Sequence, residues 1–232
     1  MARNPPADHA RPLHETDPSL VSVDGESDDA TVAETGTTIA GVTTDDAVVL
    51  AADRRASVGG GRFVTNKNTR KVESVHPSAA AALSGTVGHL QRFVRLLRAE
   101  SSLYEDRRGE PIPVEALGTL AGNVLRTSHL AIQPLVGGVD DDGPHLFEMD
   151  GGGGVLEDRY AAGGSGMQLA YGVLERRYAD GLAIEDARRL AADAIDAASE
   201  RDTASGNGLT VATVTADGVE VAEYDAAAEV AS

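Results

Sequence analysis

A Gly-Thr step inside the chain, Gly36 followed by Thr37, would gain chemistry if the chain were cut between the two residues. Cleavage would make Thr37 a terminal residue with both a hydroxyl nucleophile and a free α-amino group. Because a terminal amine titrates near about pH 7.7 to 8.0, it can accept the hydroxyl proton at working pH. One residue would then supply the nucleophile and its general base. The step predicts a cleavage-activated nucleophile; a disordered tail that meets a domain is the alternative.

The basic residues indicate where such a nucleophile could find a cation. Eighteen of the 20 are arginines, and the only lysines, Lys67 and Lys71, lie four positions apart. Lysine is a compact charge whose pKa shifts on burial, whereas arginine stays protonated and presents a planar fork. A terminal Thr needs a cation to acidify its hydroxyl, a carboxylate to fix that cation and a backbone N–H for the oxyanion. Lys71, Asp53 and Gly85 are candidates; chance clustering of the lysines is the alternative.

Composition divides the chain at the same step. Residues 1–36 are rich in Pro, Asp, Glu, Ser and Thr, show no periodicity, and are expected to be disordered. Their prolines and aspartates interrupt any apolar run, so no signal peptide is expected. Residues 37–232 are expected to form one globular domain. The boundary between the two regions therefore predicts a leader of 36 residues.

The charge and the missing cysteines limit the partners. A formal net charge of −17 argues against binding to nucleic acid or to anionic membranes. An acidic, lysine-poor chain also indicates adaptation to concentrated salt. The absence of Cys fits a reducing cytoplasm. The six His are scattered without the spacing of metal ligands, so we expect no metal and no cofactor.

The order of the predicted elements places these residues in a fold. Amphipathic helices are predicted over 87–107, 114–130, 167–178 and 184–200. Strands are predicted over 37–43, 47–52, 79–83, 135–139, 145–149, 155–157, 209–215 and 219–224, with further short strands between 62 and 84. Residues 57–61 are predicted as a loop. Blocks of strands separated by helix pairs favour an α+β fold of two antiparallel sheets packed together and covered by helices.

Several of these segments resemble an archaeal 20S proteasome β subunit of a halophile. The resemblance runs in order from Gly36 almost to the end of the chain, and it rests on the segments 37–42, 51–55, 66–72, 83–85, 163–166, 171–175 and 201–206. The family implies a four-layer αββα sandwich of the type found in N-terminal nucleophile hydrolases. It also implies that the leader is removed by self-cleavage, with Gly36 letting the backbone bend back toward Thr37.

The resemblance also assigns roles to single residues. Thr37 would be the nucleophile and, through its amine, the general base. Lys71, held by Asp53, would make the hydroxyl more acidic, and the N–H of Gly85 would form the oxyanion hole. The remaining members would hydrogen-bond around the amine and relay protons through a water: Ser165, Asp202 and Ser205. The pocket for the residue before the scissile bond would have Leu83 at its base and Ala56 and Val87 as walls, which favours large apolar side chains.

The family further implies partners and leaves two alternatives. Expected partners are other β subunits in seven-membered rings, rings of non-catalytic α subunits, an unfoldase ATPase and unfolded polypeptide substrates. One alternative is a non-catalytic ring subunit, which would be expected to lack Thr37, Asp53 or Lys71. The other is a threonine-dependent hydrolase of small amides, against which the segments 53–55 and 202–205 argue.

Overall fold

The structure is a computed structural model that describes Met1 and residues 34–231. Contacts between residues divide the chain into two units, Met1–Val32 and Ala33–Ser232. Almost all of the first unit lies outside the described residues, and with it most of the predicted leader. The second unit contains every helix and strand discussed below.

Six strands of the described part form the first sheet, and β7 (Ala79–Thr86) is central to it. One edge of β7 pairs with β8, which is followed by β9 and β10: β8 (Ile132–Asp140), β9 (Gly143–Met149) and β10 (Val155–Glu157). The other edge pairs first with β6 (Val72–His76) and then, at its end, with β1 (Glu34–Thr35). All these pairs are antiparallel. Thus β6 and β1 lie one after the other along the same edge of β7.

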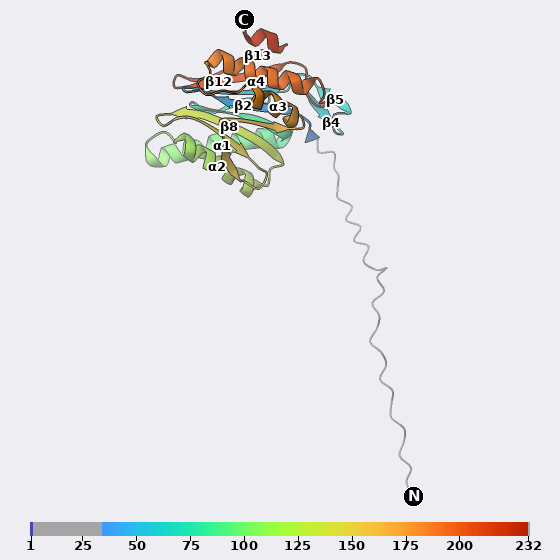
Figure 1. The fold of residues 1–232 in the computed structure, drawn as a ribbon. Coiled ribbons are helices and arrows are strands. Elements are labelled where there is room, and N and C mark those ends of the chain that lie inside the picture. The colour runs from blue at the N-terminus through green and yellow to red at the C-terminus, as the bar shows by residue number, and fades with distance from the viewer. Residues whose placement is uncertain (2–33, 232) are drawn as a thin grey trace. The chain divides into compact units, whose positions relative to one another are not determined.

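Five strands of the same region form the second sheet, which is also antiparallel. Its order is β11-β2-β3-β12-β13, with bounds β11 (Tyr160–Gly164), β2 (Thr38–Thr43), β3 (Val48–Asp53), β12 (Leu209–Thr215) and β13 (Gly218–Tyr224). A separate hairpin joins β4 (Ala56–Val58) to β5 (Phe63–Asn66). Figure 1 shows the two large sheets stacked, with this hairpin beside one end of the stack.

Helix pairs cover the outer faces of both sheets, so the second unit has four layers in the order αββα (Figure 1). The first sheet carries α1 (Val87–Arg108) and α2 (Val114–Ser128), and the second carries α3 (Met167–Arg177) and α4 (Ile184–Ser199). A short 3-10 helix, η2 (Ala227–Ala231), packs on α4. The predicted α+β sandwich is confirmed.

The layers follow from the alternation of side chains along fully buried strands. In β2 and β3, Ile39, Leu50 and Ala52 face the other sheet, while Ala40 and Val49 face α3 and α4. Successive residues of a strand point to opposite faces, so a strand with both faces covered is apolar throughout. On the helices, apolar residues at helical spacing form the buried stripes, as predicted for α1 by Leu90, Phe93, Val94 and Leu97.

Three strands differ from the sequence prediction, and all three are short. Glu34 and Thr35 form β1, although they belong to the segment expected to be disordered. Ala56–Val58 forms β4, where the loop over 57–61 was predicted. Tyr160–Gly164 forms β11, which was not predicted because Ala and Gly dominate it. In each case a neighbouring strand supplies the hydrogen bonds that the local sequence does not specify.

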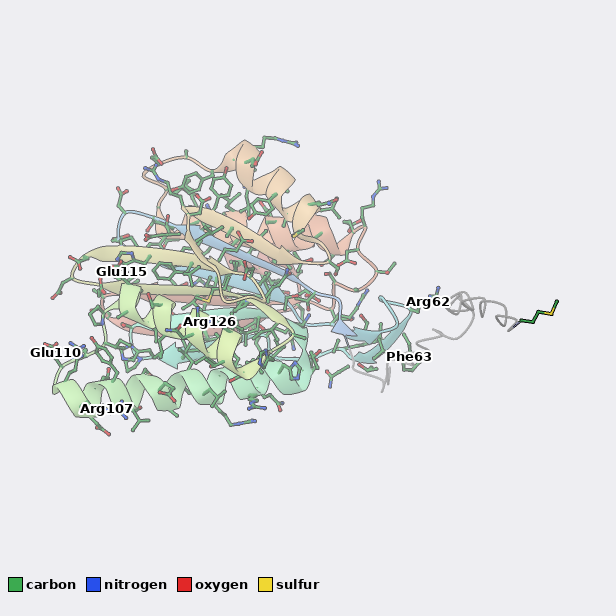
Figure 2. All side chains as sticks on the ribbon, turned by 90° about the horizontal axis from the view of Figure 1, so that it is seen from below. Arg62, Phe63, Arg107, Glu110, Glu115 and Arg126 are labelled. Atoms are coloured by element: carbon green, nitrogen blue, oxygen red, sulfur yellow. The ribbon has the colours of Figure 1, made fainter. Side chains whose placement is uncertain are left out.

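The outer faces are polar, as the charge of the chain requires. Figure 2 shows Arg107, Glu115 and Arg126 on the side of α1 and α2, and it shows Arg62 and Phe63 on the β4–β5 hairpin, away from them. Phe63 is an exception to this polarity, since 66% of its surface is exposed. Within residues 34–231, no helix combines the length and the apolar character that crossing a membrane requires.

Candidate active site

The Gly36–Thr37 step lies between β1 and β2, where β1 follows β6 along the edge of β7. Thr37 is completely buried. Because Gly36 precedes Thr37 in the chain, the nitrogen of Thr37 is a backbone amide. The predicted nucleophile is therefore enclosed by the fold.

Lys71, directly before β6, contacts the hydroxyl of Thr37. Only 1% of the lysine's surface is exposed. Its Nζ donates hydrogen bonds to Thr37 Oγ1 and, over 2.7 Å, to Asp53 Oδ1. Asp53 is the last residue of β3 and has no exposed surface. The structure thus brings together the three residues that the sequence analysis combined as nucleophile, cation and carboxylate.

The carboxylate of Asp53 accepts two hydrogen bonds at each oxygen. Oδ1 accepts from Lys71 and from the backbone N–H of Thr38, the latter at 3.0 Å. Oδ2 accepts from the backbone N–H groups of Arg55, at 3.0 Å, and Gly206, at 2.9 Å. A buried carboxylate is costly without such partners, so these donors stabilise its charged form. They also fix the position of the oxygen that holds Lys71.

Burial has the largest influence on the ionisation of Lys71, and it lowers the pKa of the amine below the usual lysine range. The charge and the hydrogen bond of Asp53 oppose this shift, as does the charge of Asp202. Lys71 therefore releases a proton more readily than an exposed lysine. Such an amine can attract negative charge on Thr37 Oγ1 and can also exchange a proton with it.

A second hydrogen-bond network surrounds the nitrogen of Thr37. The nitrogen donates to Ser165 Oγ at 3.0 Å. Ser165 and Ser205 both donate to Asp202 Oδ2 at 2.6 Å. The hydroxyls of Ser205 and Thr38 are 2.7 Å apart, so Thr38 joins the same network. The structure therefore places all three of the residues predicted to surround the amine, Ser165, Asp202 and Ser205, in one connected group.

Gly85 lies on β7, opposite Thr35 of β1. Its φ of +126° is a conformation that other residues rarely adopt, and a Cβ here would approach Ala131 O to 2.5 Å. Glycine is therefore required at this position for two reasons: other residues rarely adopt the backbone conformation, and there is no room for a Cβ. The predicted oxyanion donor lies on the strand that pairs with β1, which ends directly before the Gly36–Thr37 step.

Gly36 was expected to allow a backbone path that a Cβ would hinder, and the structure has no room for a Cβ at this position. The backbone of Gly36 does not have a positive φ, so the constraint at this position is one of space. A Cβ at this position would lie 2.0 Å from the Cβ of Ala204 and 3.2 Å from Ser165 Oγ. The glycine allows the chain to pass close to the segment that carries Asp202 and Ser205.

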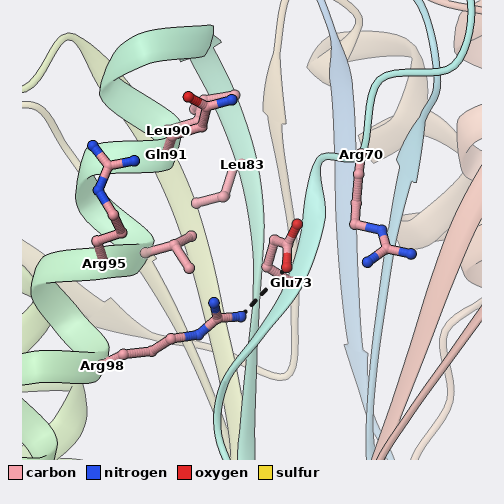
Figure 3. Close-up of a pocket in the computed structure, with 8 residues that line it drawn as sticks. Arg70, Glu73, Leu83, Leu90, Gln91, Arg95 and Arg98 are labelled. Carbon is pink, nitrogen blue, oxygen red and sulfur yellow. Dashed lines mark hydrogen bonds and ion pairs between the residues drawn. The ribbon is translucent and has the colours of Figure 1, made fainter.

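A pocket with a volume of about 190 Å³ opens beside Leu83, between β6, β7 and α1 (Figure 3). Leu83, Leu90 and Val94 provide its apolar surface, and its charged and polar lining comes from Arg70, Glu73, Gln91, Arg95 and Arg98. Glu73 and Arg98 form an ion pair of 3.4 Å. Of the three predicted pocket residues, Leu83 lines this pocket. Ala56 lies buried in β4 and Val87 begins α1, and neither is part of the lining.

The sequence analysis gave no role to two residues that hold the site. Thr38 bonds both Asp53 and Ser205, and Arg55 contacts the segment between α4 and β12. Both lie within two positions of a predicted site residue and within segments that carry the family resemblance. Their bonds to Ser205 and Thr203 could not be predicted, because these partners lie more than a hundred positions away in the chain. Among the residues that the structure describes, no three His, Cys, Asp or Glu side chains gather as a metal site would need.

Comparison with known proteins places the chain beside one family. A family model described as "Proteasome subunit" matches residues 33–214. The match contains every residue of both hydrogen-bond networks, from Thr37 to Gly206. It begins just before β1, close to the predicted boundary between leader and domain.

Three relatives come from salt-loving archaea. "Proteasome subunit beta" of Halomicrobium mukohataei is 56% identical over 214 residues, which cover 90% of each chain. The protein of the same name from Halorhabdus utahensis is 56% identical over 201 residues, or 86% of each chain. That of Natronomonas pharaonis is 56% identical over 191 residues, or 82% of this chain and 80% of its own.

Proposed function

This chain belongs to the proteasome subunit family, with β subunits of halophilic archaea among its relatives, and from that premise we propose that it is a catalytic subunit with Thr37 as its nucleophile. The observation that carries the proposal is the contact of Lys71 Nζ with both Thr37 Oγ1 and Asp53 Oδ1. Burying an amine and a carboxylate is costly unless they are well paired. A subunit that only completed a ring would not need such a pair beside a Gly-Thr step.

Activation begins with the peptide bond between Gly36 and Thr37. Thr37 Oγ1 attacks the carbonyl carbon of Gly36 while Lys71 takes up the hydroxyl proton, and the scissile nitrogen receives a proton as the bond breaks. The leader is then joined to Thr37 Oγ1 as an ester, which water hydrolyses. The products are the leader, residues 1–36, and a chain that begins with the free amine of Thr37. The close packing of Gly36 against Ala204 supports this geometry.

Substrate cleavage repeats the same chemistry between molecules. The free amine of Thr37 accepts the Oγ1 proton, and the oxygen attacks the substrate carbonyl. The N–H of Gly85 stabilises the oxyanion of the tetrahedral intermediate. The amine then protonates the leaving nitrogen, which leaves an ester on Thr37, and water hydrolyses that ester. Lys71 stabilises the developing charge on Oγ1, and Asp53 keeps Lys71 in place.

The network of Ser165, Asp202 and Ser205 keeps the amine oriented. In the uncleaved chain the nitrogen of Thr37 already donates to Ser165 Oγ, which in turn donates to Asp202. After cleavage the nitrogen is a free amine with additional N–H groups. The hydroxyls of Ser165 and Ser205 and the carboxylate of Asp202 can accept hydrogen bonds from these groups or relay their protons through a water. The role of this group is to present the lone pair of the amine to the hydroxyl proton.

The preferred substrates are unfolded polypeptides cut after large apolar residues. The family resemblance implies that the residue two positions before the oxyanion glycine lies at the base of the pocket for the side chain before the scissile bond, and here that residue is Leu83. The apolar surface of Leu83, Leu90 and Val94 favours Leu, Phe or Tyr there. Ala56 and Val87, which were expected as walls of the pocket, are not among the residues that line it.

Membership of the family implies assembly into the rings of a proteasome core with other subunits. The finer expectations are part of the proposal: sevenfold β rings, rings of non-catalytic α subunits and an unfoldase ATPase that supplies extended chains. Enclosure explains how an unselective peptidase can act in the cytoplasm without degrading folded proteins. The leader would keep the amine of Thr37 blocked until cleavage.

The test is peptide hydrolysis by the assembled protein and by its Thr37→Ala variant, with Thr127→Ala as the matched control. Thr127 is exposed on α2 and its hydroxyl bonds only within the helix, to Asn123 O. We expect hydrolysis after Leu, Phe or Tyr to exceed that after Arg or Glu, loss of activity in Thr37→Ala, and full activity in Thr127→Ala.

Two results would favour the alternatives. An assembled wild-type protein without peptidase activity would identify a non-catalytic ring subunit. Hydrolysis of small amides by an isolated monomer, with no cleavage of peptides, would identify an amidohydrolase. Full activity of Thr37→Ala would exclude the proposed nucleophile under either reading.

A further inference from the structure

The segment between α4 and β12 carries two members of the amine network, Asp202 and Ser205, but it has no helix or strand of its own. Local hydrogen bonds to Asp202 come from the backbone N–H groups of Ala204 and Ser205. A connection of this kind does not by itself hold a side chain in one position. The position of Ser205 therefore depends on groups outside the segment.

The guanidinium of Arg55 supplies such a group, and its two hydrogen bonds bracket Ser205. Nη1 donates to Thr203 O at 2.7 Å, and Nε donates to Asn207 Oδ1 at 2.9 Å. Thr203 and Asn207 are each two residues from Ser205. One planar side chain thus holds the segment on both sides of the hydroxyl that donates to Asp202.

Two further contacts join Arg55 and the segment to the catalytic carboxylate. The backbone N–H groups of Arg55 and Gly206 both donate to Asp53 Oδ2. Gly206 has a φ of +138°, and a Cβ there would lie 2.6 Å from Arg55 Nη2. The backbone of the segment therefore packs directly against the guanidinium. Asp53, Arg55 and the segment form one unit that connects the two hydrogen-bond networks.

We propose that Arg55 is a positioning residue, which holds the segment 203–207 so that Ser205 and Asp202 keep their geometry around the nitrogen of Thr37. Its side chain donates hydrogen bonds to Thr203 and Asn207, so it acts on the site through these partners. The positive charge of Arg55 also disfavours the protonated form of Lys71, which is consistent with its place at the edge of the site. This inference rests on the proposed function of Thr37.

The proposed role of Arg55 requires the planar arrangement of donors in a guanidinium and not only its positive charge. A guanidinium presents donors in a rigid plane, so it can bond Thr203 O and Asn207 Oδ1 at the same time. A lysine has one ammonium on a flexible chain and would serve one of these acceptors at most in good geometry. Arg55→Lys therefore keeps the charge and removes the bracket around Ser205.

The neighbouring arginine provides a matched control. Arg54 also lies at the end of β3, but it bonds Asn68 and pairs with Glu223 and Asp225, none of which belongs to the site. We expect Arg55→Lys to lower kcat for peptide hydrolysis by roughly 10- to 100-fold, with KM changed by less than about twofold. Arg54→Lys should retain both values. Equal kcat values for the two variants would overturn the proposal, because a general effect on the fold would not separate them.

A second variant decides the matter if Arg55→Lys fails to assemble. Asn207 is exposed and has a φ of +66°, so Asn207→Gly preserves the backbone conformation and removes only the acceptor of Arg55 Nε. We expect a lower kcat with KM preserved; an unchanged kcat in this variant overturns the proposal. Thr37→Ala, measured in parallel, separates a failure of the proposed nucleophile from a failure of the proposed role of Arg55. If Thr37→Ala is active, the proposed nucleophile is wrong. If Thr37→Ala is inactive while the Arg55 variants keep full activity, only the role of Arg55 is wrong.

Discussion

At the scale of single residues, the proposed mechanism depends on Lys71, which is buried at a position where the larger arginine side chain would not fit. Lys71 Nζ contacts Thr37 Oγ1 and Asp53 Oδ1 in a space with 1% of the lysine's surface exposed. Its lowered pKa lets it exchange a proton, whereas an arginine stays charged at any working pH. The preference of this chain for arginine elsewhere makes the choice at position 71 informative.

We predict that Lys71→Arg abolishes peptidase activity, by at least about 100-fold, and leaves ring assembly intact. A guanidinium is larger than an ammonium, so it would not fit between Thr37 and Asp53. It also does not give up its proton, so it could not exchange a proton with Thr37 Oγ1. The matched control is Lys67→Arg, since Lys67 is exposed. Peptide hydrolysis and the size of the assembly measure the two effects. Full activity of Lys71→Arg would remove Lys71 from the mechanism.

At the scale of elements, the register of the strands gathers the site at one end of the sandwich. Gly164, the end of β11, pairs with Thr38, the start of β2. Asp53, the end of β3, pairs with Leu209, the start of β12. Lys71 directly precedes β6, which lies beside β1 on the edge of β7. A shift of one residue in any of these pairs would turn a site residue to the other face of its sheet.

The sequence was sufficient to predict the helices and strands that have a clear hydrophobic periodicity. It was insufficient to predict the strands that form only by pairing with a neighbouring strand. The helices and the apolar strands were predicted because their periodicity is local. The strands β1 and β11 were missed because they are short or rich in glycine and form only against β7 and β2. The roles of Thr37, Asp53 and Lys71 came from residue types and a family resemblance. Arg55 could not be assigned, since the geometry of its bonds to Thr203 and Asn207 is a property of the folded chain.

A hydrogen-bonded pair links α1 to the first sheet and makes its stability dependent on pH. His76 Nε2 and Glu105 Oε1 are 2.7 Å apart, and the N–H of Ile112 also donates to Glu105. The hydrogen bond with His76 is the main reason that the pKa of Glu105 is lowered from its ordinary value of 4.5. A lowered carboxyl pKa stabilises the fold above the unfolded value, and this contribution is lost as the pH falls through the folded value.

We therefore predict that Glu105→Gln lowers the thermal midpoint at pH 7 by about 2 °C or less, because the pair is partly exposed. The difference from wild type should begin to shrink as the pH falls below about 4.5, the unfolded value. It should vanish below the lowered folded value, where the wild-type carboxyl is also neutral. Thermal unfolding followed from neutral to acid pH measures this, with Glu100→Gln, exposed on the same helix, as the control. A difference that stays constant over the whole range would show that the pair contributes no proton-linked stability.

At the scale of the whole molecule, the fold is that of the proteasome subunit family, whereas we interpret the high negative charge as an adaptation to concentrated salt. The chain has 37 acidic and 20 basic residues, and its relatives come from halophilic archaea. Concentrated salt screens the repulsion between carboxylates, since the screening length falls to about 3 Å at 1 M. Dilute solution leaves that repulsion in place and opposes the compact state.

We predict that the thermal midpoint rises when KCl is increased from about 0.2 M to about 3 M at constant pH, as screening takes effect. A matched solution of sucrose provides the control, because it favours the compact state without screening charge. A midpoint that is equally high in dilute and in concentrated salt would contradict the interpretation of the charge as salt adaptation.

In the proposed mechanism, Thr37 cuts its own preceding bond and then acts from the new terminus. The most direct measurement is the intact mass of the purified, assembled chain, in wild type and in a preparation in which every copy carries Thr37→Ala. We predict that the wild-type chain lacks residues 1–36 and begins at Thr37, and that the variant keeps them. An active wild-type chain that retains residues 1–36, or a Thr37→Ala chain cut at the same bond, would contradict the account.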